Sequence, residues 1–155
     1  MSTHKMQSYP NVAKQLQQRA NSYLLKHGIK DSFQLKIKRP KNSEWVAMYR
    51  GQSQFTNRWN KPIFWISPVL LDQPDEFIIS VLHEYGHVIA EYAWLTEQQE
   101  LRNLLSKYWM GKTFLRPWDE EEFAEEFAQF VYGRYAYNVE ALQQIISLWK
   151  KIGES

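Results

Sequence analysis

Two histidines four residues apart flank a glutamate in the stretch LHEYGHVIAEYA. Residues four apart in a helix lie one turn above each other, so the imidazoles of His83 and His87 can reach one cation. Glu84 lies next to the first histidine, where its carboxylate can take a proton from water at the metal. The pattern predicts a zinc site with Glu84 as general base. The alternative is a helix whose polar face carries these residues without metal.

A third metal ligand would decide between these interpretations. The chain has no cysteine, and its other histidines are His4, near the N-terminus, and His27, at a predicted helix end. There, the cationic form of His27 would favour the helix dipole, which is an ordinary capping role. The third ligand is therefore expected to be a carboxylate, and the acidic segment 119–130 (DEEEFAEEFAQF) is its obvious source.

The acidic segment also has an interpretation without metal. Asp119 as N-cap, with Glu122 reaching back, would form a capping box, and Glu120 would suit the positive end of the helix dipole. Glu121 is less well explained, because on a helical wheel it lies at the edge of the apolar arc. A carboxylate at the edge of a buried face needs a partner, and zinc would be one.

These two motifs together resemble the gluzincin arrangement of zinc metallopeptidases. The stretches HEYGHVIAEYA and EEFAEEFAQF are most similar to the catalytic domain of anthrax lethal-factor-like peptidases. The pattern Glu-x-x-Ala-x-x-Phe-Ala, which starts at Glu121, is also similar to the ImmA/IrrE peptidases, which cleave or regulate phage-type repressors. The resemblance covers roughly residues 60–150 and implies a zincin-like fold with peptidase activity.

Carried onto this sequence, the resemblance implies that His83, His87 and Glu121 bind zinc. It implies that Glu84 is the general base. Glu125, one turn beyond the ligand glutamate, would match an acid that orients a ligand imidazole.

One position departs from the lethal-factor-like pattern. Those sites have a tyrosine seven residues before the ligand glutamate, thought to steady the oxyanion, and this chain has Phe114 there. Tyr108, Arg116 or Tyr132 would have to replace the tyrosine, or the donor is missing. The departure bears on catalysis more than on metal binding.

The helix that carries the first motif is predicted to be the central one. Apolar residues cover most of its circumference over 77–94, and the polar residues fall in one arc that faces solvent or lines a cleft. Gly86 costs about 1 kcal/mol of helix stability relative to Ala, so we expect another backbone or a substrate to approach closely there.

The remaining pattern predicts an α+β fold: an N-terminal helix and a small twisted sheet, then the active-site helix and C-terminal helices. We expect a flexible tail at 1–9 and one zincin-like domain at 10–155. Predicted helices span 10–26, 74–94, 96–109, 119–136 and 138–151, and predicted strands 33–37, 45–49 and 63–66. The last strand (KPIFWIS) is expected to be the sheet edge with which an extended substrate pairs.

Composition limits the partners. A formal charge of +2 is too small to indicate nucleic-acid binding. The absence of cysteine fits a reducing compartment, and without a signal-like or membrane-spanning segment we expect a cytoplasmic monomer. The predicted function is a zinc-dependent endopeptidase acting on a protein or peptide substrate. The alternative is a zinc-binding module that regulates a partner protein with little or no hydrolysis.

Overall fold

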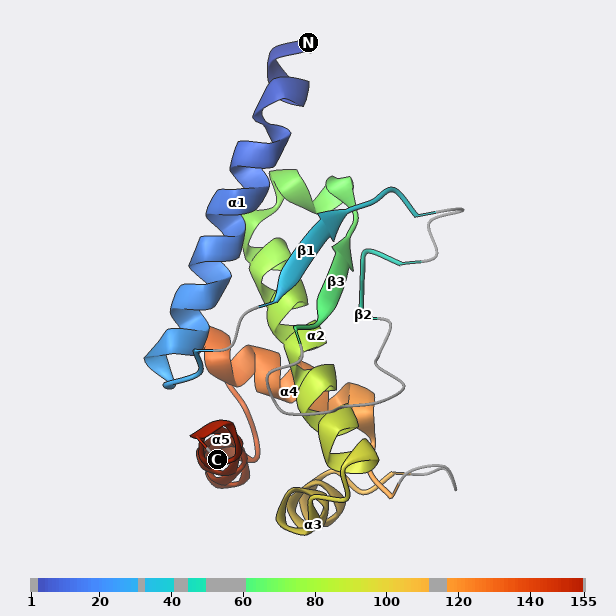
Figure 1. The fold of residues 1–155 in the computed structure, drawn as a ribbon, viewed down its shortest axis with the longest axis vertical. Helices are drawn as coiled ribbons and strands as arrows, with labels where there is room; N and C mark the ends of the chain where they lie inside the picture. Colours follow the sequence, from blue (N-terminus) through green and yellow to red (C-terminus); the bar gives the residue numbers. More distant parts are fainter. Residues whose placement is uncertain (1–2, 31–32, 41–44, 50–60, 112–116, 155) are drawn as a thin grey trace.

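The computed structural model describes residues 3–30, 33–40, 45–49, 61–111 and 117–154, with side chains from residue 10. Over these ranges the chain is α+β, with five α-helices and a small three-stranded mixed sheet (Figure 1). The elements are α1 (Thr3–Lys26), β1 (Gln34–Ile37), β2 (Ala47–Tyr49), β3 (Ile63–Ile66), the 3-10 helix η2 (Pro68–Asp72), α2 (Pro74–Leu95), α3 (Gln99–Tyr108), α4 (Glu120–Tyr132) and α5 (Val139–Glu154).

The first helix begins earlier than its sequence pattern predicts. Pro10 is favourable at a helix start, yet α1 begins at Thr3 and contains Pro10. The helix ends as expected at Gly28, whose φ of 78° lies in the left-handed region. There the N–H groups of Gly28 and Ile29 donate to the carbonyls of Leu25 and Leu24, which is a Schellman motif.

The order of the strands corrects one expectation. The sheet has the order β1-β3-β2, with β1 parallel and β2 antiparallel to β3. β3 is thus the central strand and has no free edge for a substrate, while β2 is an edge strand. The sequence placed β3 at the edge because it directly precedes the helix that carries the two histidines, but pairing between distant segments sets the order.

Helix α2 is the central helix, as predicted. It contacts α1, the sheet and α4, and thirteen of its residues are buried (Figure 1). Tyr85 lies in the core behind the two histidines, where its ring stacks on Phe127 of α4 and its hydroxyl accepts a 2.8 Å hydrogen bond from Trp149 Nε1 of α5. This packing fixes the rotation of α2 and so determines which face carries the histidines.

Helix α4 crosses α2 where Gly86 lies. A Cβ on Gly86 would come within 2.9 Å of Ala124 Cα, so only glycine lets the two backbones approach this closely. The sequence predicted that either another backbone or a substrate approaches Gly86. The structure shows that the backbone of α4 does. The close crossing brings the first turn of α4 over the polar face of α2.

Both ends of α4 follow local rules. Asp119 caps the helix by accepting the Glu122 N–H at 3.0 Å. The reciprocal half of the predicted capping box is replaced, because the Asp119 N–H donates to the carbonyl of Trp109. The helix ends at Tyr132 rather than at 136, since Gly133 adopts a φ of 97°.

Helices α3 and α5 pack together at the end of α2 that is distant from the N-terminus (Figure 1). Arg102 of α3 donates hydrogen bonds to the carbonyls of Ala93 and Trp94, which satisfies acceptors at the C-terminal end of α2. Among the described residues, no helix is long and apolar enough to cross a membrane.

Candidate metal site

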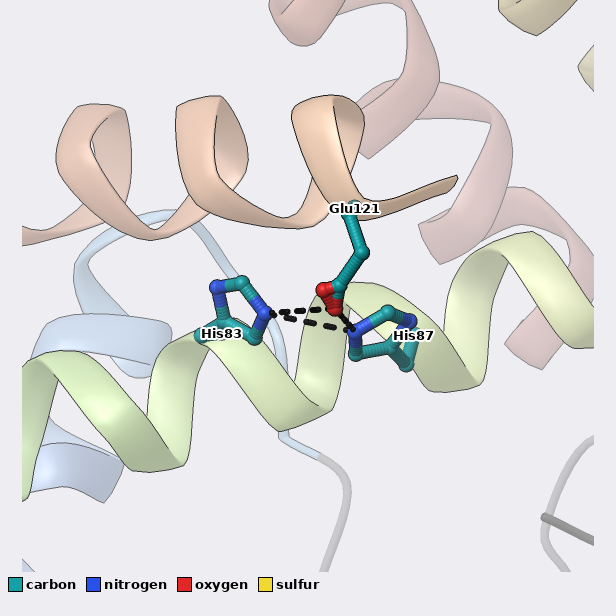
Figure 2. A group of neighbouring side chains, drawn as sticks. All are labelled: His83, His87 and Glu121. Atoms are coloured by element: carbon teal, nitrogen blue, oxygen red, sulfur yellow. Dashed lines mark hydrogen bonds and ion pairs between the residues drawn. The ribbon is translucent and has the colours of Figure 1, made fainter. Parts of the chain in front are cut away.

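Three predicted ligand atoms converge on one point. His83 and His87 project from α2, and Glu121 reaches them from the first turn of α4 (Figure 2). The two Nε2 atoms are 3.2 Å apart, and Glu121 Oε1 lies 3.2 Å from His83 Nε2 and 2.7 Å from His87 Nε2. Ligands about 2.0–2.1 Å from a tetrahedral ion are about 3.4 Å apart, so two edges of this triangle nearly match that spacing.

The other nitrogen of each imidazole faces a carboxylate. His83 Nδ1 lies 3.0 Å from Glu125 Oε2, and His87 Nδ1 lies 2.6 Å from Glu120 Oε2. Because a carboxylate accepts hydrogen bonds, these contacts favour a proton on each Nδ1, which leaves the Nε2 lone pairs directed at the shared point. Two nitrogens and a carboxylate oxygen repel each other in this arrangement unless a proton or a cation lies between them. The donor set therefore fits a metal ion such as zinc.

The structure brings together the three predicted metal ligands. His83, His87 and Glu121 form the group that could hold a metal ion. Glu125 contacts a ligand imidazole, as predicted. The role of Glu120 was missed because its place in the first helical turn already explained it. The sequence did contain a signal for this role. If two histidines bind a metal, each is expected to have an acid that orients its ring, and only Glu125 had been assigned.

Glu84 lies beside this group and is only 7% exposed. Its Oε1 accepts a 2.8 Å hydrogen bond from the backbone N–H of Tyr49 in β2, which fixes the carboxylate. Burial raises the pKa of Glu84 above its usual value, despite the opposing effects of the histidines and the Tyr49 N–H. Burial also acts to raise the pKa of Glu121, but the charges and hydrogen bonds of His87 and His83 lower it overall.

The group that could hold a metal ion, His83, His87 and Glu121, lies in a cleft between β2, α2 and α4, and we refer to these three residues as the metal-binding group. Two pockets, of about 340 and 390 Å³, adjoin at Ala47, Glu84 and Glu121, one on the side of His87 and the other on the side of His83. The sequence left open whether the polar arc of α2 faces solvent or lines a cleft. In the structure it lines this cleft. Its members there are Ser80, His83, Glu84, His87 and Glu91.

A further hollow, of about 570 Å³, lies between α3 and α5. Leucine, amide and hydroxyl side chains line it together with Glu100 and Glu140. The described residues of its lining include no histidine, so they offer fewer metal-binding or proton-transfer groups than the cleft at the metal-binding group does.

Of the oxyanion donors that the sequence offered, the two that the structure describes, Tyr108 and Tyr132, do not line this cleft. Phe114 and Arg116 lie outside the described residues. The hydroxyl of Tyr132 donates to Asp75, and Tyr108 packs against the ring of Trp109. Neither tyrosine is among the described residues that line the two pockets.

His27 lies at the C-terminal end of α1, where the sequence predicted it. Burial lowers its pKa, with further lowering by the charges of Lys150 and Lys26, so the neutral form is favoured. Its ring packs 5.2 Å from that of Phe130, between centroids.

Comparison with protein families, with curated proteins and with solved structures found no match for this chain.

Proposed function

We propose that this chain is a zinc-dependent peptidase with a zincin-like catalytic domain. The observation that carries the proposal is the convergence of two Nε2 atoms and one carboxylate oxygen next to a buried glutamate in an open cleft. The two imidazoles and the carboxylate are the protein ligands of many catalytic zinc ions, which keep the fourth position for water or substrate.

Each residue has a definite role in this proposal. His83, His87 and Glu121 would hold the ion, and Glu125 and Glu120 would keep both rings in the required tautomer. When bound, zinc supplies a Lewis acid that activates water and polarises a carbonyl group. Glu84 would accept the proton of that water and later deliver it to the leaving amine.

The Tyr49 N–H occupies only one oxygen of Glu84, so the other oxygen stays available for proton transfer. Residues 47–49 of β2 line the cleft next to Glu84, and β2 lies at the end of the strand order. An extended peptide pairing with the free edge of β2 would pass across the metal-binding group.

A second candidate is a zinc-binding module without hydrolytic activity. It is favoured by the sequence, which has Phe114 where lethal-factor-like peptidases have their tyrosine. Two alternative donors, Tyr108 and Tyr132, contact Trp109 and Asp75 instead. Such a protein would use the same cleft to hold a partner segment.

The test combines metal analysis with Glu84→Gln. We expect about one zinc per chain in protein purified without added metal, and hydrolysis of members of a peptide library. Glu84→Gln should keep the zinc and the fold, because the amide oxygen can still accept the Tyr49 N–H. Its rate should fall by about 10²–10⁴-fold, because an amide cannot accept the proton.

Equal rates for the parent and Glu84→Gln would exclude this mechanism. Stoichiometric zinc without cleavage by the parent would favour the binding module, and protein without zinc would refute both candidates.

A further inference from the structure

A groove leads from the metal-binding group along α4 to a single arginine. Glu121, Glu125 and Gln129 are spaced four residues apart, so they form one stripe along the helix, and all three line the pocket on the side of His83. Arg134 lines the same pocket beyond the C-terminal end of α4 and is the one Lys or Arg side chain among the described residues of that lining. Four glutamates are among the described residues of this lining: Glu76 and Glu84 on α2, and Glu121 and Glu125 on α4. Glu76 follows Asp75 in the first turn of α2, so it lies toward the Arg134 end.

The backbone of Arg134 is held in place by the end of α4. The Gly133 N–H donates to the Phe130 carbonyl at 3.0 Å, and the Arg134 N–H donates to the Gln129 carbonyl at 2.8 Å. These two bonds form a Schellman motif, which Gly133 permits through its φ of 97°. Arg134 is therefore ordered even though it follows the helix.

The side chain of Arg134 is also supported. Its guanidinium lies 5.0 Å from the centre of the Tyr132 ring, and the Tyr132 hydroxyl donates to Asp75 in the first turn of α2. The hydrogen bond to Asp75 raises the pKa of Tyr132 to about 12, so the phenol keeps its proton and the link at neutral pH. Within the part of the chain that the structure describes, no carboxylate forms an ion pair with Arg134.

We propose that Arg134 binds a carboxylate of the substrate, either an acidic side chain or the C-terminal carboxylate. The inference rests on the proposed peptidase function, because it treats this groove as part of the substrate site. An ordered, unpaired guanidinium presents parallel donors that match a carboxylate, and stacking on a tyrosine leaves its edge available. Three of the four glutamates, Glu84, Glu121 and Glu125, lie at the histidine end and disfavour an anion there, so the carboxylate is recognised at the other end of the groove, where Arg134 lies.

The geometry sets the spacing. Glu121 and Tyr132 are separated by about three helical turns, or roughly 16 Å along α4. The arginine side chain can reach back along part of this length, and an extended peptide advances about 3.3 Å per residue. We therefore expect the recognised carboxylate about three to five residues from the bond that is cleaved.

Labelled decapeptides of mixed sequence provide the probe. One set carries a single Glu at each position in turn and a second carries Gln instead, each with a free or an amidated C-terminus. Binding is measured by fluorescence anisotropy on zinc-loaded Glu84→Gln protein, with and without Arg134→Gln. Cleavage is measured separately on the zinc-loaded parent and on Arg134→Gln. Lys107→Gln is the matched control, because Lys107 also lies over a tyrosine ring but belongs to α3.

Peptides with a carboxylate should bind more tightly than their neutral counterparts, and Arg134→Gln should weaken their binding about 10–100-fold. Neutral peptides should bind equally to both proteins, and Lys107→Gln should change nothing. Dependence on Glu at one position identifies a side chain as the source of the carboxylate, whereas dependence on the free C-terminus identifies the chain end.

The two proposals fail in different ways. Cleavage without preference for a carboxylate, or a preference that Arg134→Gln does not change, overturns this inference and leaves the peptidase. Binding that depends on Arg134 without any cleavage upholds the anion site and argues against the peptidase. Absence of binding and of cleavage overturns the anion site.

Discussion

The carboxylates behind the histidine rings determine how well each ring can bind a cation. Glu125 and Glu120 each contact an Nδ1 atom, so both imidazoles are held with Nε2 directed at Glu121. A carboxylate partner also increases the basicity of a ligand imidazole. The metal-binding group and its two supporting acids thus make five side chains, of which three would touch the ion.

This division of roles predicts an order of zinc affinities. Loss of an orienting acid usually weakens metal binding about 10–100-fold, so Glu120→Gln and Glu125→Gln should each fall in that range. Glu121→Gln should weaken binding more than either, because it removes the charge of a ligand. Competition with a fluorescent zinc chelator measures all three. A greater loss in Glu125→Gln than in Glu121→Gln would reverse the assignment of the ligand.

Among the elements, the crossing of α2 and α4 sets the size of the site. Gly86 lies under Ala124, and Glu121 lies one turn earlier on α4 than Ala124. Any increase in the separation of the two helices would move Glu121 away from His83 and His87. The glycine in the HEYGH stretch is therefore required by a helix contact rather than by the chemistry.

Gly86→Ala should consequently weaken zinc binding. The added Cβ meets backbone at 2.9 Å, and overpacking of this kind costs about 1–3 kcal/mol, against a gain of about 1 kcal/mol in helix propensity. We expect a small loss of unfolding free energy, measured by urea denaturation, together with a clear loss of zinc affinity.

Gly133→Ala is the control for this experiment. Its Cβ would meet no atom within 4 Å, but its φ of 97° makes alanine strained. It should lower stability while leaving zinc affinity nearly unchanged. Equal zinc affinity in the parent and Gly86→Ala would show that the helix separation does not set the site.

The elements also show what the sequence could and could not predict. The proximity of His83, His87 and Glu121 was predicted because helical spacing is local and because Glu121 lies at the edge of an apolar arc. The strand order was not, since a free edge depends on which distant segments pair. The last helix turn at 133–136 was overpredicted because apolar periodicity continues past Gly133, whose left-handed conformation ends α4. Glu120 was missed because a helix wheel does not show which neighbouring helix an acid will face.

At the scale of the whole molecule, the core joins segments that are distant in sequence. Tyr85 links α2 to α4 and α5, and His27 brings the end of α1 against Phe130 of α4. The metal-binding group adds a further link between α2 and α4 on the opposite side of α2 from Tyr85. Stability should therefore respond both to the protonation of His27 and to the metal.

The lowered pKa of His27 predicts a loss of stability in acid. Its folded pKa lies below the unfolded value of about 6.5, so the unfolded chain binds more protons as pH falls through 6.5. The contribution of neutral His27 to the free energy of unfolding is therefore complete above pH 6.5. Below that pH it decreases, by at most about 1.4 kcal/mol per pH unit. In metal-free protein, urea unfolding between pH 7.5 and 5.5 should show a weaker pH dependence for His27→Gln than for the parent. If the unfolding free energies of both proteins change equally with pH, the pH dependence does not come from His27.

Zinc should stabilise the folded chain because the site exists only when α2 and α4 are packed together. At a free zinc concentration of 100 times the dissociation constant, the gain in unfolding free energy is about 2.7 kcal/mol. For a domain of this size that corresponds to a rise in Tm of roughly 5–10 °C. Thermal unfolding of the parent in zinc and in chelator measures the difference, and Glu121→Gln, whose affinity is reduced, should show a smaller one at the same zinc concentration. Lys107→Gln, on α3, should show the full shift. If the parent unfolds at the same temperature in zinc and in chelator, the three converging atoms hold no ion, and the function proposed from them fails with it.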